Sequence, residues 1–156
     1  MTPYVGVVGP GDADAELERL AYEVGELLAR AGAVVLCGGR GGVMAAAARG
    51  AAAGEGTSIG LLPGTDRTAA AEALTYALAT GLGQLRNGLL VSASDGLISV
   101  GSSWGTLNEV ALAVRVGKPV VALRGWSITD NGTDLEGILP VESPEHAVTQ
   151  LFQLLT

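Results

Sequence analysis

The chain has 156 residues, of which 48% are hydrophobic and only 4% aromatic, with 24 glycines and a formal net charge of −7. This length supports one well-formed core, and the composition is typical of an α/β protein with Val/Ile/Leu strands, Ala-rich helices and tight turns. The negative charge disfavours binding to nucleic acid or to an anionic membrane surface, because both repel an acidic protein. Any anion must therefore bind in a local pocket.

The single cysteine, Cys37, excludes an intrachain disulfide, and we expect the protein in the cytoplasm. The N-terminus enters an apolar segment without the basic flank or the long apolar core of a signal peptide. No apolar run approaches the ~20 residues that a membrane span needs, so we expect no membrane association.

The first part of the chain predicts alternating strands and helices. Apolar residues recur with helical spacing from Asp14, a predicted N-cap, to Gly32, and an Ala-rich helix follows from Val43 to about Ala53. Short apolar runs predict strands at residues 4–8, 33–37 and 57–62. Three strands joined by two helices require a parallel sheet with right-handed crossovers, as in Rossmann-like proteins.

The second part continues this alternation after a less regular stretch. Residues 66–72 suit a helical turn, and residues 73–79 suit either strand or helix, with the alternation of Leu74, Tyr76 and Leu78 favouring a strand. We then expect a helix at 84–94, a strand at 96–100, a helix at 105–116, a strand at 119–123, a polar loop, and a last helix opened by Ser143-Pro144-Glu145. The sequence therefore predicts one α/β domain over residues 1–156, a Rossmann-like three-layer α/β/α fold with a mostly parallel sheet.

The turn Gly38-Gly39-Arg40-Gly41-Gly42 is the first candidate site, because it ends a strand and opens a helix. Glycines there let backbone N–H groups approach a phosphate, and a helix N-terminus favours negative charge. The spacing fits neither a Walker A loop nor G-x-G-x-x-G, and a tight turn that needs positive φ is the alternative. The positive charge of Arg40 favours an anion site.

A second turn of this kind runs from Gly101 to Thr106 and contains hydroxyl groups that can donate to a phosphate or cap the helix. The carboxyl ends of parallel strands meet at one edge of a sheet, so the two turns and the end of the first strand converge on a crevice. We therefore predict that a ligand phosphate is bound by Gly9, Gly38, Gly39, Arg40, Gly41, Gly42, Gly101, Ser102, Ser103, Gly105 and Thr106.

Four further side chains are candidates for ligand contact. Glu109 is expected in the first turn of its helix, where the helix dipole stabilises a carboxylate by roughly 0.3–1 kcal/mol. Arg86 and Asn87 lie near a helix start, and Trp104 lies inside the second turn. The sequence indicates no metal site and no catalytic triad, because it contains one histidine and one cysteine without suitable neighbours.

These motifs together resemble the LOG-like Rossmann superfamily, once labelled lysine decarboxylase-like. That superfamily includes cytokinin-activating phosphoribohydrolases and molybdenum cofactor carrier proteins. The resemblance covers about the whole chain and rests on the order and spacing of Gly38 to Met44, Ile59 to Pro63, Arg86-Asn87 and Gly105 to Glu109. It implies a homodimer or a homotetramer.

The two branches of this superfamily differ in the residues of the site, and the chain matches each branch in part. In the phosphoribohydrolases the signature is PGGxGTxxE, and Gly105, Thr106 and Glu109 match it, whereas Gly101-Ser102-Ser103 replaces Pro-Gly-Gly. Arg86-Asn87 is closer to the carrier-protein branch than to the Arg-Lys pair of the hydrolases. A decarboxylase has no support, since Lys118, the sole lysine, lacks the surroundings of a pyridoxal phosphate site.

The leading hypothesis is a binding protein for a phosphorylated nucleotide-like ligand, such as a nucleotide or the molybdenum cofactor, with no cofactor required. The alternative is a nucleoside 5′-monophosphate phosphoribohydrolase that releases free base and ribose 5-phosphate, in which Arg86 and Glu109 are catalytic. A third hypothesis is a ligand-sensing module that acts through partner proteins.

Overall fold

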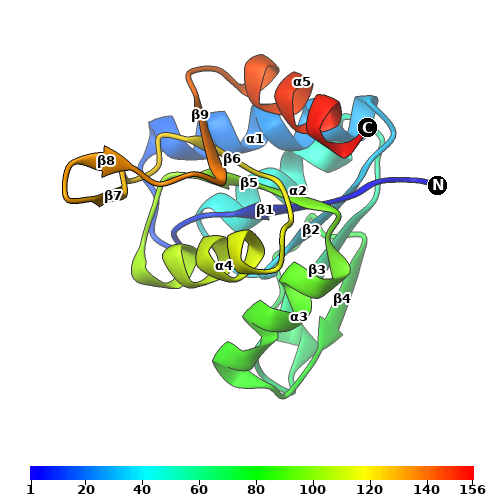
Figure 1. Cartoon of the computed structure of the whole chain (residues 1–156). Helices are drawn as coiled ribbons and strands as arrows, with labels where there is room; N and C mark the ends of the chain where they lie inside the picture. The colour runs from blue at the N-terminus through cyan, green and yellow to red at the C-terminus, as the bar shows by residue number, and fades with distance from the viewer.

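The computed structural model describes residues 1–156, whose strands form one seven-stranded sheet and a separate two-stranded ribbon (Figure 1). The strand order is β4-β3-β2-β1-β5-β6-β9, and every neighbouring pair is parallel. The strands are β1 Tyr4–Val8, β2 Val34–Cys37, β3 Ser58–Leu62, β4 Tyr76–Ala79, β5 Gly96–Val100, β6 Val120–Leu123 and β9 Ile138–Val141. The predicted α/β class and parallel sheet are confirmed.

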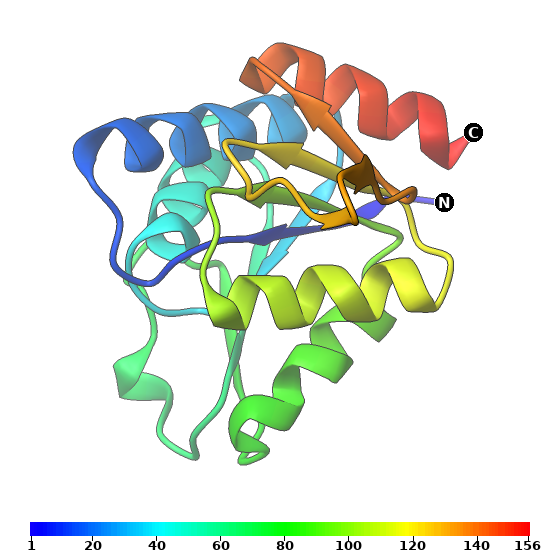
Figure 2. The same cartoon turned by 60° about the vertical axis from the view of Figure 1, so that its left-hand side comes forward.

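Helices cover both faces of this sheet and complete the three layers (Figures 1 and 2). One face is covered by α1, α2 and α5, and the other by α3 and α4. Their bounds are α1 Ala15–Arg30, α2 Val43–Ala53, α3 Arg86–Ala93, α4 Trp104–Arg115 and α5 Pro144–Leu155. None of these helices has the length and hydrophobicity that a membrane crossing needs.

The first helix shows why the sequence pattern predicted it well. The Asp14 carboxylate accepts a hydrogen bond from the Leu17 N–H at 2.9 Å and so caps α1. Leu20, Val24 and Leu28 then recur on one face and are buried in the larger core. Local capping and apolar spacing are sufficient to define this element.

Two glycines let α1 and α2 approach each other closely. A Cβ atom at Gly50 would lie 1.9 Å from the carbonyl oxygen of Tyr22, and one at Gly25 would lie 2.2 Å from that of Ala47. Only residues without a side chain fit between the two backbones at this distance. The small residues of α2 therefore pack on the chain's own α1.

The segment between β6 and α5 differs from the polar loop that the sequence predicts. It contains the antiparallel ribbon of β7 (Thr129–Asp130) and β8 (Thr133–Asp134), followed by β9. The sequence pattern hides β9 because Pro140 interrupts its short apolar run. A proline is tolerated there because β9 is an edge strand that pairs only with β6.

The less regular stretch in the middle forms short elements. Residues 66–72 contain a 3₁₀ helix, Arg67–Ala69, and the expected strand at 73–79 is confirmed over Tyr76–Ala79. The helix predicted from residue 84 begins as a 3₁₀ turn at Gly83–Leu85 and becomes α3 at Arg86. These short helices and β4 place the start of α3 beyond the carboxyl end of the sheet.

Replacing Gly50 by alanine tests the close packing of α1 on α2. We expect Gly50→Ala to lower the free energy of unfolding by about 1–3 kcal/mol, because the new methyl group forces the helices apart. Urea denaturation measures the change. Gly88→Ala in α3 is the matched control, since a Cβ there meets no atom within 4 Å, and it should leave stability unchanged or raise it.

Candidate functional site

The order of the strands creates a crevice between β1 and β5. From β1 the chain moves outward through β2, β3 and β4, and it then returns to place β5 on the other side of β1. The loops that follow β1 and β5 therefore leave the sheet in opposite directions. Ligands of open α/β sheets bind at this point, outside the carboxyl ends of the strands.

A cleft of about 470 Å³ lies at this edge and is lined from the segments that follow five strands. The predicted residues that line it are Gly9, Arg40, Arg86, Asn87, Ser103, Trp104, Gly105, Thr106 and Glu109. Sequence reasoning missed Gly11, Met44, Pro63, Gly83, Gln84 and Asn108, which line it as well. For Asn108 a signal was present, because it stands beside Glu109, one helical turn after Gly105.

The glycines of the loop after β2 make room for atoms that lie next to the cleft. A Cβ atom at Gly38 would lie 2.7 Å from Nη1 of Arg86, so the missing side chain makes room for the guanidinium. Gly42 has a φ of +60°, and a Cβ atom there would lie 2.4 Å from the carbonyl oxygen of Pro10. From this loop, Arg40 and the Met44 side of α2 line the cleft, whereas Gly38, Gly39, Gly41 and Gly42 do not.

The serines of the turn after β5 both make internal hydrogen bonds. Ser103 caps α4, with its Oγ accepting from the Thr106 N–H at 3.2 Å and lying 2.9 Å from the Thr106 hydroxyl. Ser102 Oγ accepts from the Trp126 N–H at 2.9 Å, and neither Ser102 nor Gly101 lines the cleft. Ser102 therefore ties the segment after β6 to this turn.

This cap corrects the expected place of Glu109. Because Ser103 is the N-cap, α4 begins at Trp104 and its first turn holds no acidic residue. Glu109 lies in the second turn, where the helix dipole no longer stabilises a carboxylate strongly. Its side chain is buried, with 7% of its surface exposed.

Burial and Arg86 act on Glu109 in opposite directions. Burial raises the pKa of Glu109 to about 7, because desolvation penalises the carboxylate, and the nearby Arg86 guanidinium offsets part of this rise. At neutral pH the neutral carboxylic acid is therefore a populated form of Glu109, unlike an exposed glutamate. A group with such a pKa can hold or release a proton under physiological conditions.

Arg86 is held by a chain of polar side chains that leaves some of its donors free. Its Nη1 donates to Asn87 Oδ1 at 3.2 Å, and Asn87 Nδ2 donates to Asn108 Oδ1 at 3.0 Å. Arg86 Nε is buried without a hydrogen-bond partner. A buried donor without a partner costs free energy, which the packing of the folded chain must offset.

Trp104 lines the cleft, and Trp126 packs against its ring from outside the cleft. Trp104 is 79% exposed, and its ring meets that of Trp126 edge to face, with centroids 5.1 Å apart. An exposed aromatic ring beside a polar cleft is suited to stacking on a flat ligand.

Two other reactive groups are kept out of the cleft. Cys37 is fully buried, and burial raises the pKa of its thiol to about 11, so it is no nucleophile. Lys118 donates to the backbone carbonyls of Val91, Ser92 and Ser94 at the end of α3. No group of three or more His, Cys, Asp or Glu side chains that could hold a metal ion occurs in residues 1–156.

Comparison with known proteins places this geometry in context. The SLOG cluster4 family matches residues 2–148. An uncharacterized protein from Archaeoglobus fulgidus is 40% identical over 144 residues, which are 92% of this chain and 91% of the relative.

Solved structures resemble the chain over its whole length. The molybdenum cofactor binding protein from Rippkaea orientalis superposes with a TM-score of 0.90 at 36% identity, covering 100% of this chain and 99% of that one. A molybdenum cofactor carrier protein from Chlamydomonas reinhardtii gives a TM-score of 0.87 at 35% identity, covering 99% and 98%.

The buried carboxyl group makes stability depend on pH. The pKa of Glu109 rises from 4.5 to about 7 on folding, so between these pH values the unfolded state loses a proton that the folded state keeps. Stability therefore falls as pH rises from about 4.5 to 7, by about 3 kcal/mol at most. We expect Glu109→Gln to remove this fall, so that the variant is the more stable protein at pH 8.

Urea denaturation at pH 4.5, 6 and 8 measures this difference. Glu136→Gln changes an exposed acid by the same single substitution and controls for the loss of charge. A Glu109→Gln profile that stays parallel to the parent profile would contradict the assignment.

Proposed function

Because the chain belongs to the SLOG cluster4 family, we propose that it binds a phosphorylated, nucleotide-like small molecule and carries the molybdenum cofactor or a close relative as its cargo. The observation that carries this proposal is the polar cleft at the β1/β5 crevice, which two arginines and a helix N-terminus line. The two cofactor-binding relatives, alike in fold over nearly the entire chain, support it.

The N-terminus of α4 is the proposed seat of the ligand phosphate. The first-turn N–H groups of Trp104 and Gly105 have no helical carbonyl to bind, as at any helix start. A Cβ atom at Gly105 would meet only Ser103 Oγ, at 3.9 Å, so the approach to these amides is open. A phosphate is stabilised there by backbone donors and by the helix dipole together.

Arg40 and Arg86 supply the positive charge on the other side of the cleft. Arg40 is exposed and can swing over a bound anion, whereas Arg86 is fixed by its hydrogen bond to Asn87. Guanidinium groups match the oxygen atoms of a phosphate with paired N–H donors. In a protein with net charge −7, this local arrangement is what makes anion binding favourable.

A phosphoribohydrolase remains a second candidate because of one observation. Glu109 is buried beside Arg86 with a pKa of about 7, which suits a group that exchanges protons with substrate or water. In this alternative, ionised Glu109 stabilises the cationic ribose centre or orients water, while Arg86 positions the ribose. The hydroxyl of Ser103 replaces the open glycine surface of the hydrolase signature and favours binding over turnover.

We also propose that the protein forms a homodimer or homotetramer through the end of the molecule that contains β4 and α3 (Figure 1). β4 is an edge strand, and exposed apolar side chains gather on β4, on α3 and between them. They are Tyr76, Leu78, Leu82, Leu85 and Leu89. An apolar surface of this kind is typical of a protein interface.

The ligand that accompanies the protein during purification tests the leading proposal. We expect mass spectrometry of the denatured protein to find a phosphorylated pterin or nucleotide, with molybdenum detected by elemental analysis if the cargo carries its metal. Arg86→Gln and Arg40→Gln should each reduce the bound amount at least tenfold, because each removes a charged phosphate contact worth about 1.5–3 kcal/mol. Arg115→Gln, at the far end of α4, is the control. If both cleft variants bind as much ligand as the parent protein, the proposal is contradicted.

Incubation with AMP tests the hydrolase alternative. If the protein is a phosphoribohydrolase, chromatography should detect adenine at a rate that falls at least 100-fold in Glu109→Gln, since that variant keeps the shape but cannot ionise. Equal adenine release by parent and variant, or none by either, would exclude this activity on AMP.

A further inference from the structure

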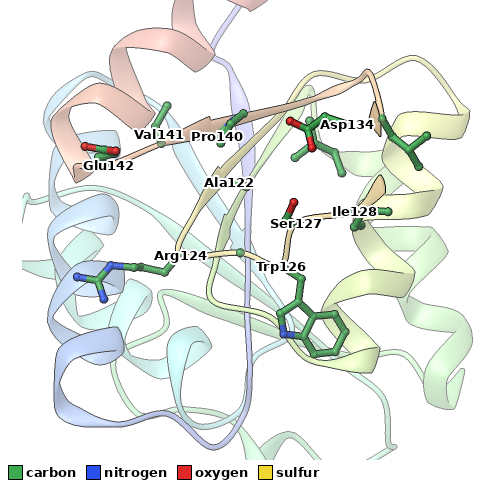
Figure 3. A pocket seen from close by; sticks show the side chains of 12 residues that line it. Ala122, Arg124, Trp126, Ser127, Ile128, Asp134, Pro140, Val141 and Glu142 are labelled. Carbon is green, nitrogen blue, oxygen red and sulfur yellow. The ribbon is translucent and has the colours of Figure 1, made fainter. Parts of the chain in front are cut away.

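A second groove, of about 660 Å³, lies beside the cleft at the carboxyl ends of β6 and β9 (Figure 3). Trp126, Ile128, Leu135 and Ile138 supply its apolar lining, and its polar groups include Asp134. None of the phosphate-binding residues proposed above lines this groove. The residues that line the groove therefore determine which ligand group it suits.

The groove and the cleft are joined through one pair of aromatic rings. Trp104 lines the cleft, Trp126 lines the groove, and their centroids are 5.1 Å apart. Adjacent serines hold the two sides, since Ser103 caps the helix that carries Trp104 and Ser102 accepts from the Trp126 N–H. The cleft and the groove therefore adjoin each other at this pair of rings.

The charges of the groove do not suit a second phosphate. Asp134 and Glu142 both line it, against the single cation Arg124. The Arg124 guanidinium lies 3.6 Å from the carboxylate of Glu16, which neutralises part of its charge. An anion placed here would be repelled, whereas an uncharged group with N–H donors would find carboxylate acceptors.

The chain adopts a left-handed backbone conformation where it leaves β6. Arg124 has a φ of +60°, a conformation that costs free energy in a residue with a side chain. Arg124 directly follows β6, and in Figure 3 the Ser127 hydroxyl points toward Pro140, whereas the Trp126 ring at the edge of the groove points away from Pro140 and Val141.

The aromatic and acidic groups of the groove together suit a flat, uncharged heterocycle as ligand. Trp126 is 45% exposed and offers an aromatic surface, with Ile128 and Ile138 completing an apolar slot. Figure 3 shows the Asp134 carboxylate directed toward the middle of the groove. A carboxylate there can accept from two adjacent N–H groups of a ring edge, as guanine and pterins present.

We propose that this groove is a subsite for the heterocycle of the ligand whose phosphate occupies the cleft, and that it selects rings with adjacent N–H donors. The inference rests on the proposed function, since the cleft must hold the phosphate. It adds the class of ring and the residues that read it, Trp126 by stacking and Asp134 by hydrogen bonds.

Titration calorimetry with nucleotides of increasing length tests the proposal. GMP, GDP and GTP place the same base at three distances from the terminal phosphate, and AMP, ADP and ATP are the matched controls with a different ring edge. Neopterin triphosphate separates a pterin from guanine, and ribose 5-phosphate reports on the cleft alone. We expect at least one guanine or pterin compound to bind ten or more times tighter than its adenine counterpart.

The variants show whether the groove causes that preference. Asp134→Asn should reduce the preference for guanine or pterin rings at least fivefold. Trp126→Ala should weaken the binding of every nucleotide, whereas Trp126→Phe should keep the affinity of the parent protein. Ribose 5-phosphate should bind all variants equally. If ribose 5-phosphate binds but the variants leave nucleotide affinity and preference unchanged, the subsite is overturned and the cleft stands. If no compound binds, the proposed function and the subsite both fall.

Discussion

The reversal of strand order between β1 and β5 sets where every loop at the carboxyl edge of the sheet can lie. Parallel strands need crossover connections, and the chain builds outward from β1 in one direction before it returns to build in the other. The two central loops must then separate at the carboxyl edge, which opens the cleft. The ends of β1 and β5 approach each other closely, because a Cβ atom at Gly9 would lie 2.3 Å from the carbonyl oxygen of Val100. A glycine at the end of β1 therefore permits the approach that forms the crevice floor.

The cleft combines groups that suit an anion with one acid that would oppose it. Arg40, Arg86 and the N-terminus of α4 attract negative charge, whereas ionised Glu109 would repel it. Burial resolves this conflict, since it holds the pKa of Glu109 near 7 and keeps a substantial part of the group neutral. A phosphate near Glu109 would favour the protonated form further. Proton uptake and anion binding are thus coupled in the proposed site.

The turn after β5 explains why binding is the better-supported function. Its two serines differ from the glycines of the hydrolase signature, and both have structural partners: Ser103 caps α4, and Ser102 holds the segment that carries Trp126. These bonds join the cleft to the groove beyond it. A turn that connects the cleft and the groove suits a ligand that extends from one into the other.

The parallel α/β fold, six of the seven strands of the main sheet and most residues that line the cleft could be predicted from the sequence, because apolar periodicity, caps and glycine turns are local signals. Other features arise only from contacts between distant segments. Gly38 proved to make room for Arg86, Gly50 for α1, and Glu109 acquired its shifted pKa from burial. The edge strand β9 and the groove beside it also depended on neighbours distant in sequence. Space, desolvation and strand pairing arise only when such segments meet, so no local pattern encodes them.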